Sequence, residues 1–349
     1  MMFKKLFYSS LGAVVLSGIA GIVAAYMGLG IWALAIQQLV NHAATTIIMW
    51  FTVKWRPKLV FSFTRVKTLF TFGWKLLTSS LIDVFYKDLR TLIIGRIYIP
   101  SMLGYYNRGQ SFPQVIVSNI NGSIQSVMLP TLSAHQDNKK RVKEMMRRSI
   151  VTSSFIIFPM MAGMAVLAEP MVRIVLTDKW LSAVPFIQIF CISYSLWPIH
   201  TANLQAINSM GRSDIFLKLE IIKKIVGLII LGVSLPFGIH ALAFSSVISG
   251  FISSFINAYP NRKLLDYSYK EQITDIMPSL IITIIMGAVV YSMNVLNISD
   301  FALLILQILV GAISYFLLSK IFKLESFDYL LNTVKELVNL KKKTRKQID

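Results

Sequence analysis

The sequence predicts an all-α fold, a polytopic bundle of about ten transmembrane helices with both termini in the cytoplasm. Hydrophobic residues make up 55 % of the chain and charged residues only 15 %, whereas soluble chains are about 45–50 % apolar and about 25 % charged. Apolar runs of about 20 residues, long enough to cross a hydrocarbon core about 30 Å thick, recur along the chain. The Lys and Arg residues gather in alternate connections between these runs, as in membrane proteins.

Short polar breaks and Gly or Pro residues separate the apolar runs. The first run follows a basic start and continues unbroken to Met27 without a small-residue cleavage site, so we interpret it as a span and not as a signal peptide. The expected spans are 7–27, 31–53, 74–98, 110–133, 150–168, 183–209, 215–236, 238–258, 277–296 and 301–322.

The distribution of positive charge predicts the orientation of the chain. With the N-terminus inside, 28 of the 35 Lys and Arg residues fall in cytoplasmic segments, four fall within the third span, and only Arg108, Arg173 and Lys179 fall outside. This asymmetry predicts an even number of spans with both ends in the cytoplasm. Because the basic residues are divided among alternate connections, the net charge of +19 does not indicate nucleic-acid binding.

The C-terminal tail predicts an amphipathic helix. Apolar residues recur at helical spacing from Phe327 to Val338, and five basic residues follow in 341–346. Such a helix lies on the inner leaflet with its basic end attracted to anionic lipid. The alternative is a solvated tail.

The third expected span carries charges near its middle, where an ionisable group costs about 2.5–3.5 kcal/mol on insertion scales. At 100° per residue, Asp83, Lys87 and Arg90 fall within about 60° of one another, with Tyr86 beside them and Asp88 about 100° from Lys87. This face predicts an aqueous cavity with a cationic wall, in which Arg90 offers a bidentate fork and Lys87 a point charge to an anionic ligand. The alternative is a closed set of ion pairs that locks the helix against its neighbours.

Amide and hydroxyl groups in several spans suit sugar hydroxyls. They also join helices through hydrogen bonds worth about 0.6 kcal/mol on average, which is an alternative for each of them. His42 and His200 can either titrate in a coupled transport step or make an interhelical hydrogen bond. The candidate sugar contacts are Tyr86, Asn119, Gln125 and Asn203.

The seventh expected span is fully apolar only from Ile225 to Leu235, which is too short to cross a bilayer alone. It must therefore begin near Ile215. The charged residues that this places at its cytoplasmic mouth are Lys218, Glu220, Lys223 and Lys224. The lysines either snorkel to the interface or form a basic vestibule for a phosphorylated lipid.

Motifs for catalysis are absent from the sequence, which lacks G-x-x-x-x-G-K-[ST], G-x-S-x-G, H-E-x-x-H and C-x-x-C. The single cysteine, Cys191, fits a small buried hydrophobe. We therefore expect no cofactor, no metal and no enzymatic activity. An intramembrane polymerase or transferase would need an outer carboxylate or histidine, and the outer segments offer only Glu169, Asp178 and Asp300.

Several stretches, in this order and spacing, resemble the Wzx-like lipopolysaccharide and polysaccharide flippases of the multidrug/oligosaccharidyl-lipid/polysaccharide exporter superfamily. The likeness extends to about residue 260 and weakens beyond. The stretches are Phe72-Gly73-Trp74 to Ser80, Asp88 to Arg96, Leu103 to Arg108, Leu129 to Ser133, Phe158 to Gly163 with Ala168-Glu169-Pro170, and Gly211 to Asp214.

The resemblance implies two lobes of six helices around a central cavity, often followed by two extra helices. Family members usually carry about four more spans before the region matching Phe3 to Ala25, so we expect an N-terminally truncated member. The expected parts are the last two helices of a first lobe with a cytoplasmic linker in 1–70, a six-helix second lobe in 71–260, two additional helices in 261–322, and the basic tail in 323–349.

The resemblance also implies a function: flipping of an undecaprenyl-diphosphate-linked oligosaccharide across the bacterial cytoplasmic membrane, by alternating access, for polysaccharide or O-antigen export. It assigns diphosphate binding to Lys87, Arg90 and Arg96, and pairing or coupling to Asp83 and Asp88. The implied partners are the lipid-linked oligosaccharide, membrane lipids, a polysaccharide polymerase and glycosyltransferases.

Two other functions remain open from the sequence. A cation or drug antiporter of the same superfamily needs an acidic pocket, for which Asp83 and Asp88 are the mid-span carboxylates. A non-functional truncated membrane protein would show no transport.

Overall fold

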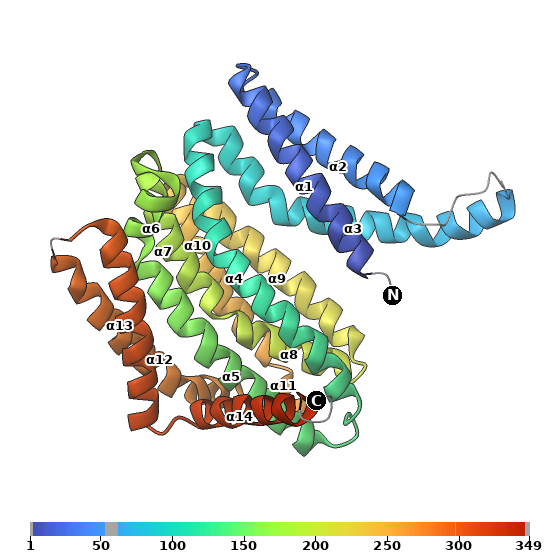
Figure 1. Ribbon diagram of the computed structural model, residues 1–349. Helices are drawn as coiled ribbons and strands as arrows, with labels where there is room; N and C mark the ends of the chain where they lie inside the picture. Colours follow the sequence, from blue (N-terminus) through green and yellow to red (C-terminus); the bar gives the residue numbers. More distant parts are fainter. Residues whose placement is uncertain (1–2, 53–61, 297, 346–349) are drawn as a thin grey trace. The chain divides into compact units, whose positions relative to one another are not determined.

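The computed structural model describes residues 3–52, 62–296 and 298–345, and all regular structure in these residues is helical (Figure 1). This confirms the predicted all-α fold. The chain divides into two compact units, Met1–Thr78 and Ser79–Asp349, and the boundary falls inside helix α3 (Phe63–Ile97).

Unit 1 contains two helices joined by a tight turn, α1 (Phe3–Tyr26) and α2 (Trp32–Thr52). Gly28 and Gly30 form the turn with φ angles of +77° and +52°, which glycine adopts without steric cost. The two helices pack closely because Gly21 has no side chain; a Cβ atom there would lie 3.0 Å from Cβ of Gln37. These helices coincide with the first two expected spans.

Unit 2 begins with the second half of α3 and holds the remaining helices. Its longer helices are α4 (Pro100–Ser133), α5 (Lys139–Val166), α7 (Val184–Ser195), α8 (Trp197–Ser209), α9 (Ser213–Ser234), α10 (Ile239–Ala258), α12 (Tyr269–Ser292), α13 (Asp300–Ile321) and α14 (Glu325–Arg345). The shorter ones are α6 (Ala168–Leu176), α11 (Asn261–Leu264) and the 3₁₀ turns η1 (Asp178–Ala183), η2 (Leu235–Phe237) and η3 (Met293–Val295). The eight remaining expected spans coincide with helices of this set.

The expected span 183–209 is the exception to a one-to-one match, because it consists of two helices, α7 and α8. The helix breaks at Leu196, two residues before Pro198. Proline has no N–H to donate, and its ring clashes with the carbonyl four residues earlier, here that of Tyr194.

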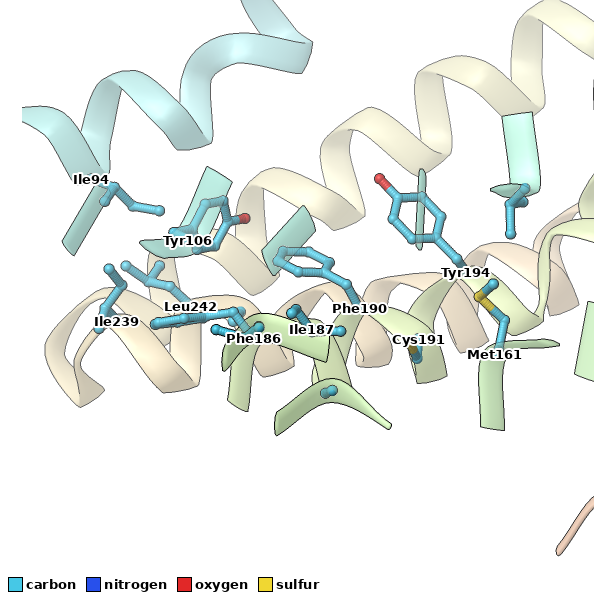
Figure 2. Close-up of a cluster of buried hydrophobic side chains, with 14 of the residues drawn as sticks. Ile94, Tyr106, Met161, Phe186, Ile187, Phe190, Cys191, Tyr194, Ile239 and Leu242 are labelled. Atoms are coloured by element: carbon cyan, nitrogen blue, oxygen red, sulfur yellow. The ribbon is translucent and has the colours of Figure 1, made fainter. Parts of the chain in front are cut away.

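Helices α4 and α7 of unit 2 approach each other closely where they cross. A Cβ atom on Gly109 would overlap with Cβ of Phe186 and lie 3.0 Å from the backbone nitrogen of Ile187. Beside this contact, Tyr106 packs edge-on against Phe186 and Phe190, with ring centroids 5.9 and 5.2 Å apart. Figure 2 shows this row of aromatic rings within the cluster of buried hydrophobic residues.

The last three long helices pack onto α5. Tyr315 of α13 donates a hydrogen bond of 2.8 Å to the carbonyl of Phe155 in α5. The tail forms α14, as expected, and lies crosswise to α5 and α12 at one end of unit 2 (Figure 1). Arg147 of α5 holds the start of α14 through Glu325 at 3.2 Å. The position of this helix on a lipid leaflet stays a prediction.

Six segments in the described residues are long and apolar enough to cross a membrane: Ser9–Tyr26, Lys139–Val166, Asp178–Ser209, Ile239–Leu264, Tyr269–Val295 and Asp300–Ile321. The other four expected spans correspond to α2, α3, α4 and α9, whose polar residues lower their hydropathy. The total of ten spans and the cytoplasmic placement of the termini therefore stay predictions. Three of these four more polar helices line the cavity in unit 2.

Candidate functional site

A cavity of about 790 Å³ lies within unit 2, between the end of α3 and helices α4, α7, α8, α9 and α10. Binding pockets for small molecules commonly measure about 300–1,000 Å³. The described charged groups in its lining are Arg90, Glu220, Lys223 and Lys224. The described part of the wall therefore carries three cations and one carboxylate, a net charge of +2.

Arg90 of α3 is fixed against α10. Its Nη1 atom donates to the carbonyl oxygen of Leu242 at 2.6 Å and to the hydroxyl oxygens of Ser245 and Ser246 at 2.9 and 2.6 Å. Among the side chains that the structure describes, no carboxylate lies within ion-pair distance of this guanidinium. These three contacts hold the side chain in place. Because all three acceptors are neutral, they do not compensate the positive charge of the guanidinium.

The wall formed by α9 supplies the other cations. Lys223 pairs with Glu220 at 2.6 Å, and the two side chains are only 15 % and 31 % exposed. The Lys224 ammonium lies 5.8 Å from the ring centre of Tyr86 in α3, a cation–π distance. These positions favour the basic vestibule over lysines that snorkel to the interface, because Lys223 and Lys224 both line the cavity.

Charges at the start of α9 are arranged differently and lie outside the cavity. Arg212 donates two hydrogen bonds to Asp214, of 2.9 and 2.8 Å. These bonds lower the pKa of the Asp214 carboxyl to about 2. This pair is therefore self-neutralised over the physiological pH range, and Lys223 and Lys224 are the α9 cations that face the cavity.

Small polar residues of α10 form a further wall. Ser246, Ser249, Ser253 and Asn257 recur at intervals of three or four residues, so they share one helix face. Nδ1 of His200, from α8, lies 3.1 Å from the amide nitrogen of Asn257. From α4, Gln110 donates to the hydroxyl of Tyr194 in α7 at 3.1 Å, and Figure 2 shows that hydroxyl pointing out of the apolar cluster.

The structure brings two of the predicted site residues, Tyr86 and Arg90, into the cavity wall. The side chains of Asp83 and Lys87 lie outside the described part of the structure, so their roles stay predictions. Arg96 is exposed and does not line the cavity. The six residue steps from Arg90 to Arg96 rotate the helix by a net angle of about 240°, so the two guanidinium groups cannot share one face.

The remaining predicted residues do not reach the cavity. Asp88 and Gln125 are exposed outside it. Asn119 is exposed too and donates to the carbonyl of Val115 in its own helix at 2.7 Å. Asn119 and Gln125 therefore do not line this cavity, and their assignment as sugar contacts stays a prediction. His42 is exposed in unit 1.

Asn203 is buried among hydrogen-bonding partners and does not line the cavity, and its assignment as a sugar contact stays a prediction. It is 0 % exposed. Its Nδ2 donates to Gln272 at 2.7 Å, and its Oδ1 accepts from Asn261 at 2.7 Å and from Gln272 at 3.1 Å. These bonds join α8 to α11 and α12. Asn203 therefore has the role that the sequence left open as the alternative to sugar binding, namely hydrogen bonding between helices.

Replacing Asn203 with alanine is expected to destabilise the protein by about 1–3 kcal/mol, because the amides of Gln272 and Asn261 would be left unsatisfied in the interior. Thermal unfolding in detergent measures this change. Asn119→Ala is the matched control and should shift the melting temperature little, since Asn119 is exposed. Loss of ligand binding at unchanged stability in Asn203→Ala would contradict this structural role and support Asn203 as a ligand contact.

The polar wall formed by α10 has a recognisable signal in the sequence. Ser246, Ser249, Ser253 and Asn257 form a polar stripe at helical spacing along one face of the expected span 238–258. The aromatic part of the wall, Tyr106 and Tyr194, had no comparable signal, because aromatic residues at helical spacing are usually core residues.

Fold and cavity together define a class: a multi-pass helical membrane protein with a chamber among its helices whose described wall carries a net positive charge. The sequence profile of a family described as "Polysaccharide biosynthesis protein" matches residues 1–185. The chain belongs to this family, which confirms the resemblance found in the sequence.

Curated relatives carry related names. The teichuronic acid biosynthesis protein TuaB of Bacillus subtilis is 25 % identical over 312 residues, which cover 85 % of this chain and 63 % of TuaB. The lipopolysaccharide biosynthesis protein WzxC of Escherichia coli is 25 % identical over 308 residues, covering 83 % of this chain and 62 % of WzxC. The chain thus spans less than two thirds of the length of these relatives.

A solved structure has a similar fold. The lipid II flippase MurJ, in an inward closed conformation, matches with a TM-score of 0.70 and 17 % identity, over 89 % of this chain and 66 % of MurJ. At this identity the likeness concerns the fold alone.

Proposed function

We propose that the protein translocates a lipid-linked oligosaccharide across the bacterial cytoplasmic membrane, with the diphosphate of the lipid carrier received in the cavity of unit 2. The observation that carries this proposal is the Arg90 guanidinium, fixed by α10 at the cavity wall without a described carboxylate partner. A charge at that depth is costly unless it faces water or an anion.

The chemistry of the wall suits a diphosphate attached to a sugar. Arg90, Lys223 and Lys224 supply positive charge for phosphate oxygens. The serine hydroxyls of α10, together with Gln110 and the tyrosines, supply hydrogen-bonding groups of the kind that bind sugar hydroxyls. Curated relatives named for teichuronic acid and lipopolysaccharide biosynthesis support a saccharide as the transported group.

The rival transport function is less well supported. A cation antiporter needs a net-acidic wall, and the described lining holds one carboxylate, Glu220, which is already paired with Lys223. The function is that of a transporter and not of an enzyme. The implied partners, a polymerase and glycosyltransferases, belong to the same proposal, since they would use or make the lipid-linked saccharide.

The test uses the full chain reconstituted in liposomes. The probe is a fluorescent undecaprenyl-diphosphate saccharide, whose arrival in the outer leaflet is measured by quenching with a membrane-impermeant reductant. We expect faster translocation of this probe than of an uncharged undecaprenyl saccharide that lacks the diphosphate. Equal rates for the two probes, or rates no higher than in empty liposomes, would contradict the proposal.

A further inference from the structure

Aromatic rings form a row along one wall of the cavity. Tyr106 of α4, Phe190 and Tyr194 of α7, and Trp197 at the start of α8 all line it. Successive ring centroids lie 5.2, 6.2 and 5.0 Å apart, which are distances of direct ring contact. Figure 2 shows the first three of these rings in sequence. The row holds the indole of Trp197 in a fixed place on the wall.

Trp197 differs from the other three rings in its exposure. Tyr106, Phe190 and Tyr194 are 1 %, 2 % and 7 % exposed, so protein covers their faces. Trp197 is only partly buried. Its indole N–H has no hydrogen-bond partner among the described residues and is not one of their enclosed polar atoms. Because a buried indole N–H usually has a partner, this donor is open to water or to a ligand in the cavity.

The backbone beside Trp197 is interrupted at Leu196, between α7 and α8. Gly250 of α10, itself part of the cavity wall, lies against this break, since a Cβ atom there would be 3.8 Å from Cδ1 of Leu196. Non-helical backbone at membrane depth is tolerated where it is buried in protein or lines a water-filled cavity. Discontinuous helices of this kind form substrate sites in transporters, so the break independently favours a ligand contact at Trp197.

The break is connected to Arg90 through one residue of α10. The hydroxyl of Ser246 accepts a hydrogen bond of 2.6 Å from Arg90, and its carbonyl accepts one of 3.3 Å from Ser193 of α7. Trp197 follows Ser193 by four residues and lines the same cavity as Arg90. A ligand held by Arg90 at one end therefore has Trp197 available on the same cavity wall.

The chemistry of the indole suits a sugar. A pyranose ring has a face of C–H groups and a rim of hydroxyls, and the indole offers an apolar face and one hydrogen-bond donor. A lipid tail would use the ring face alone. We infer that Trp197 is the sugar-binding platform of the cavity and stacks on a pyranose ring of the saccharide whose diphosphate is held at Arg90. This inference rests on the proposed function and extends it to the residue that recognises the sugar.

The test measures binding of two probes, undecaprenyl diphosphate and an undecaprenyl-diphosphate saccharide, to the full chain in lipid nanodiscs. The wild type should bind the saccharide more tightly. Trp197→Leu should weaken saccharide binding about tenfold, because the stacking and the hydrogen bond are lost together. The same variant should leave the affinity for undecaprenyl diphosphate unchanged. Trp197→Phe, which keeps a ring and loses the N–H, should weaken saccharide binding about threefold.

Trp180→Leu is the matched control. Trp180 of η1 is also partly buried and packs edge-on against a tyrosine, Tyr105, with ring centroids 5.7 Å apart, but it lies outside the cavity. This variant should bind both probes as the wild type does. The melting temperature of each variant shows that it is folded, and Trp197→Phe carries the test if Trp197→Leu is not.

Equal weakening of both probes by Trp197→Leu would assign Trp197 a structural role and overturn the inference. Saccharide binding that neither Trp197 variant changes would overturn it too, as would equal affinity of the wild type for the two probes. These three results leave diphosphate binding intact. Failure of the wild type to bind either probe would instead contradict the proposed function.

Discussion

Arg90→Gln is expected to reduce translocation of the undecaprenyl-diphosphate probe at least about tenfold. A hydrogen bond to a charged group contributes about 1.5–3 kcal/mol, and tenfold in rate corresponds to about 1.4 kcal/mol. The Arg90 charge is fixed by its contacts with Leu242, Ser245 and Ser246. Arg90→Lys should recover part of the rate, since lysine keeps the charge but loses the planar fork. Initial rates in liposomes measure both effects.

Arg96→Gln is the matched control for this prediction. Arg96 belongs to the same helix, carries the same charge and is exposed outside the cavity. Its neutralisation should leave the rate unchanged. Equal losses in the two variants would mean that the positive charge acts through the membrane surface and not through the cavity.

Gly109→Ala is expected to destabilise the protein by about 1–3 kcal/mol, the usual cost of forcing extra atoms into a packed core. The new Cβ atom would meet Cβ of Phe186 and the backbone of Ile187, and a backbone cannot rotate away as a flexible side chain can. Helices α4 and α7 would have to separate, which would also displace the cavity residues that they carry. The melting temperature in detergent measures the loss.

Gly122→Ala, on the same helix, is the control. A Cβ atom at Gly122 meets nothing within 4 Å. Alanine has a higher helix propensity than glycine by about 1 kcal/mol, so this variant should be neutral or more stable. If Gly109→Ala and Gly122→Ala lowered the melting temperature equally, the close approach of α4 and α7 could not be the cause of the destabilisation.

The positions of the helices could be predicted from the sequence because long apolar runs between polar breaks have few other structures available in a membrane. Two features of the helices were not predicted from the sequence, the break between α7 and α8 and the short helix α6, and each has a local cause. The break between α7 and α8 follows from Pro198, which transmembrane helices often accommodate without interruption. Helix α6 has only nine residues and is too short to show a periodic pattern.

The site was predictable only in part. The face of α3 that contains Tyr86 and Arg90 followed from helical geometry. The contacts of the amide side chains could not be predicted in this way. The sequence shows that a residue is polar, but it does not show which neighbouring helix that residue contacts. Asn203 and His200 are three residues apart on α8, yet Asn203 bonds to Gln272 and His200 to Asn257. That difference depends on the packing of helices far apart in the chain.

The central claim is that unit 2 encloses a wet cavity with a positive wall, and cysteine accessibility tests it most directly. Cys191, the single native cysteine, is buried and can be replaced by serine to give a cysteine-free background. In that background Ser249→Cys lies in the cavity wall, and Ile248→Cys lies beside it, outside the cavity. Membrane-impermeant thiol reagents of opposite charge, applied to the reconstituted full chain, then report on water and charge.

The account predicts that Ser249→Cys reacts, that the anionic reagent reacts faster than the cationic one, and that Arg90→Gln reduces this preference. Ile248→Cys should remain unreactive. An unreactive Ser249→Cys, or a faster reaction with the cationic reagent, would contradict the claim.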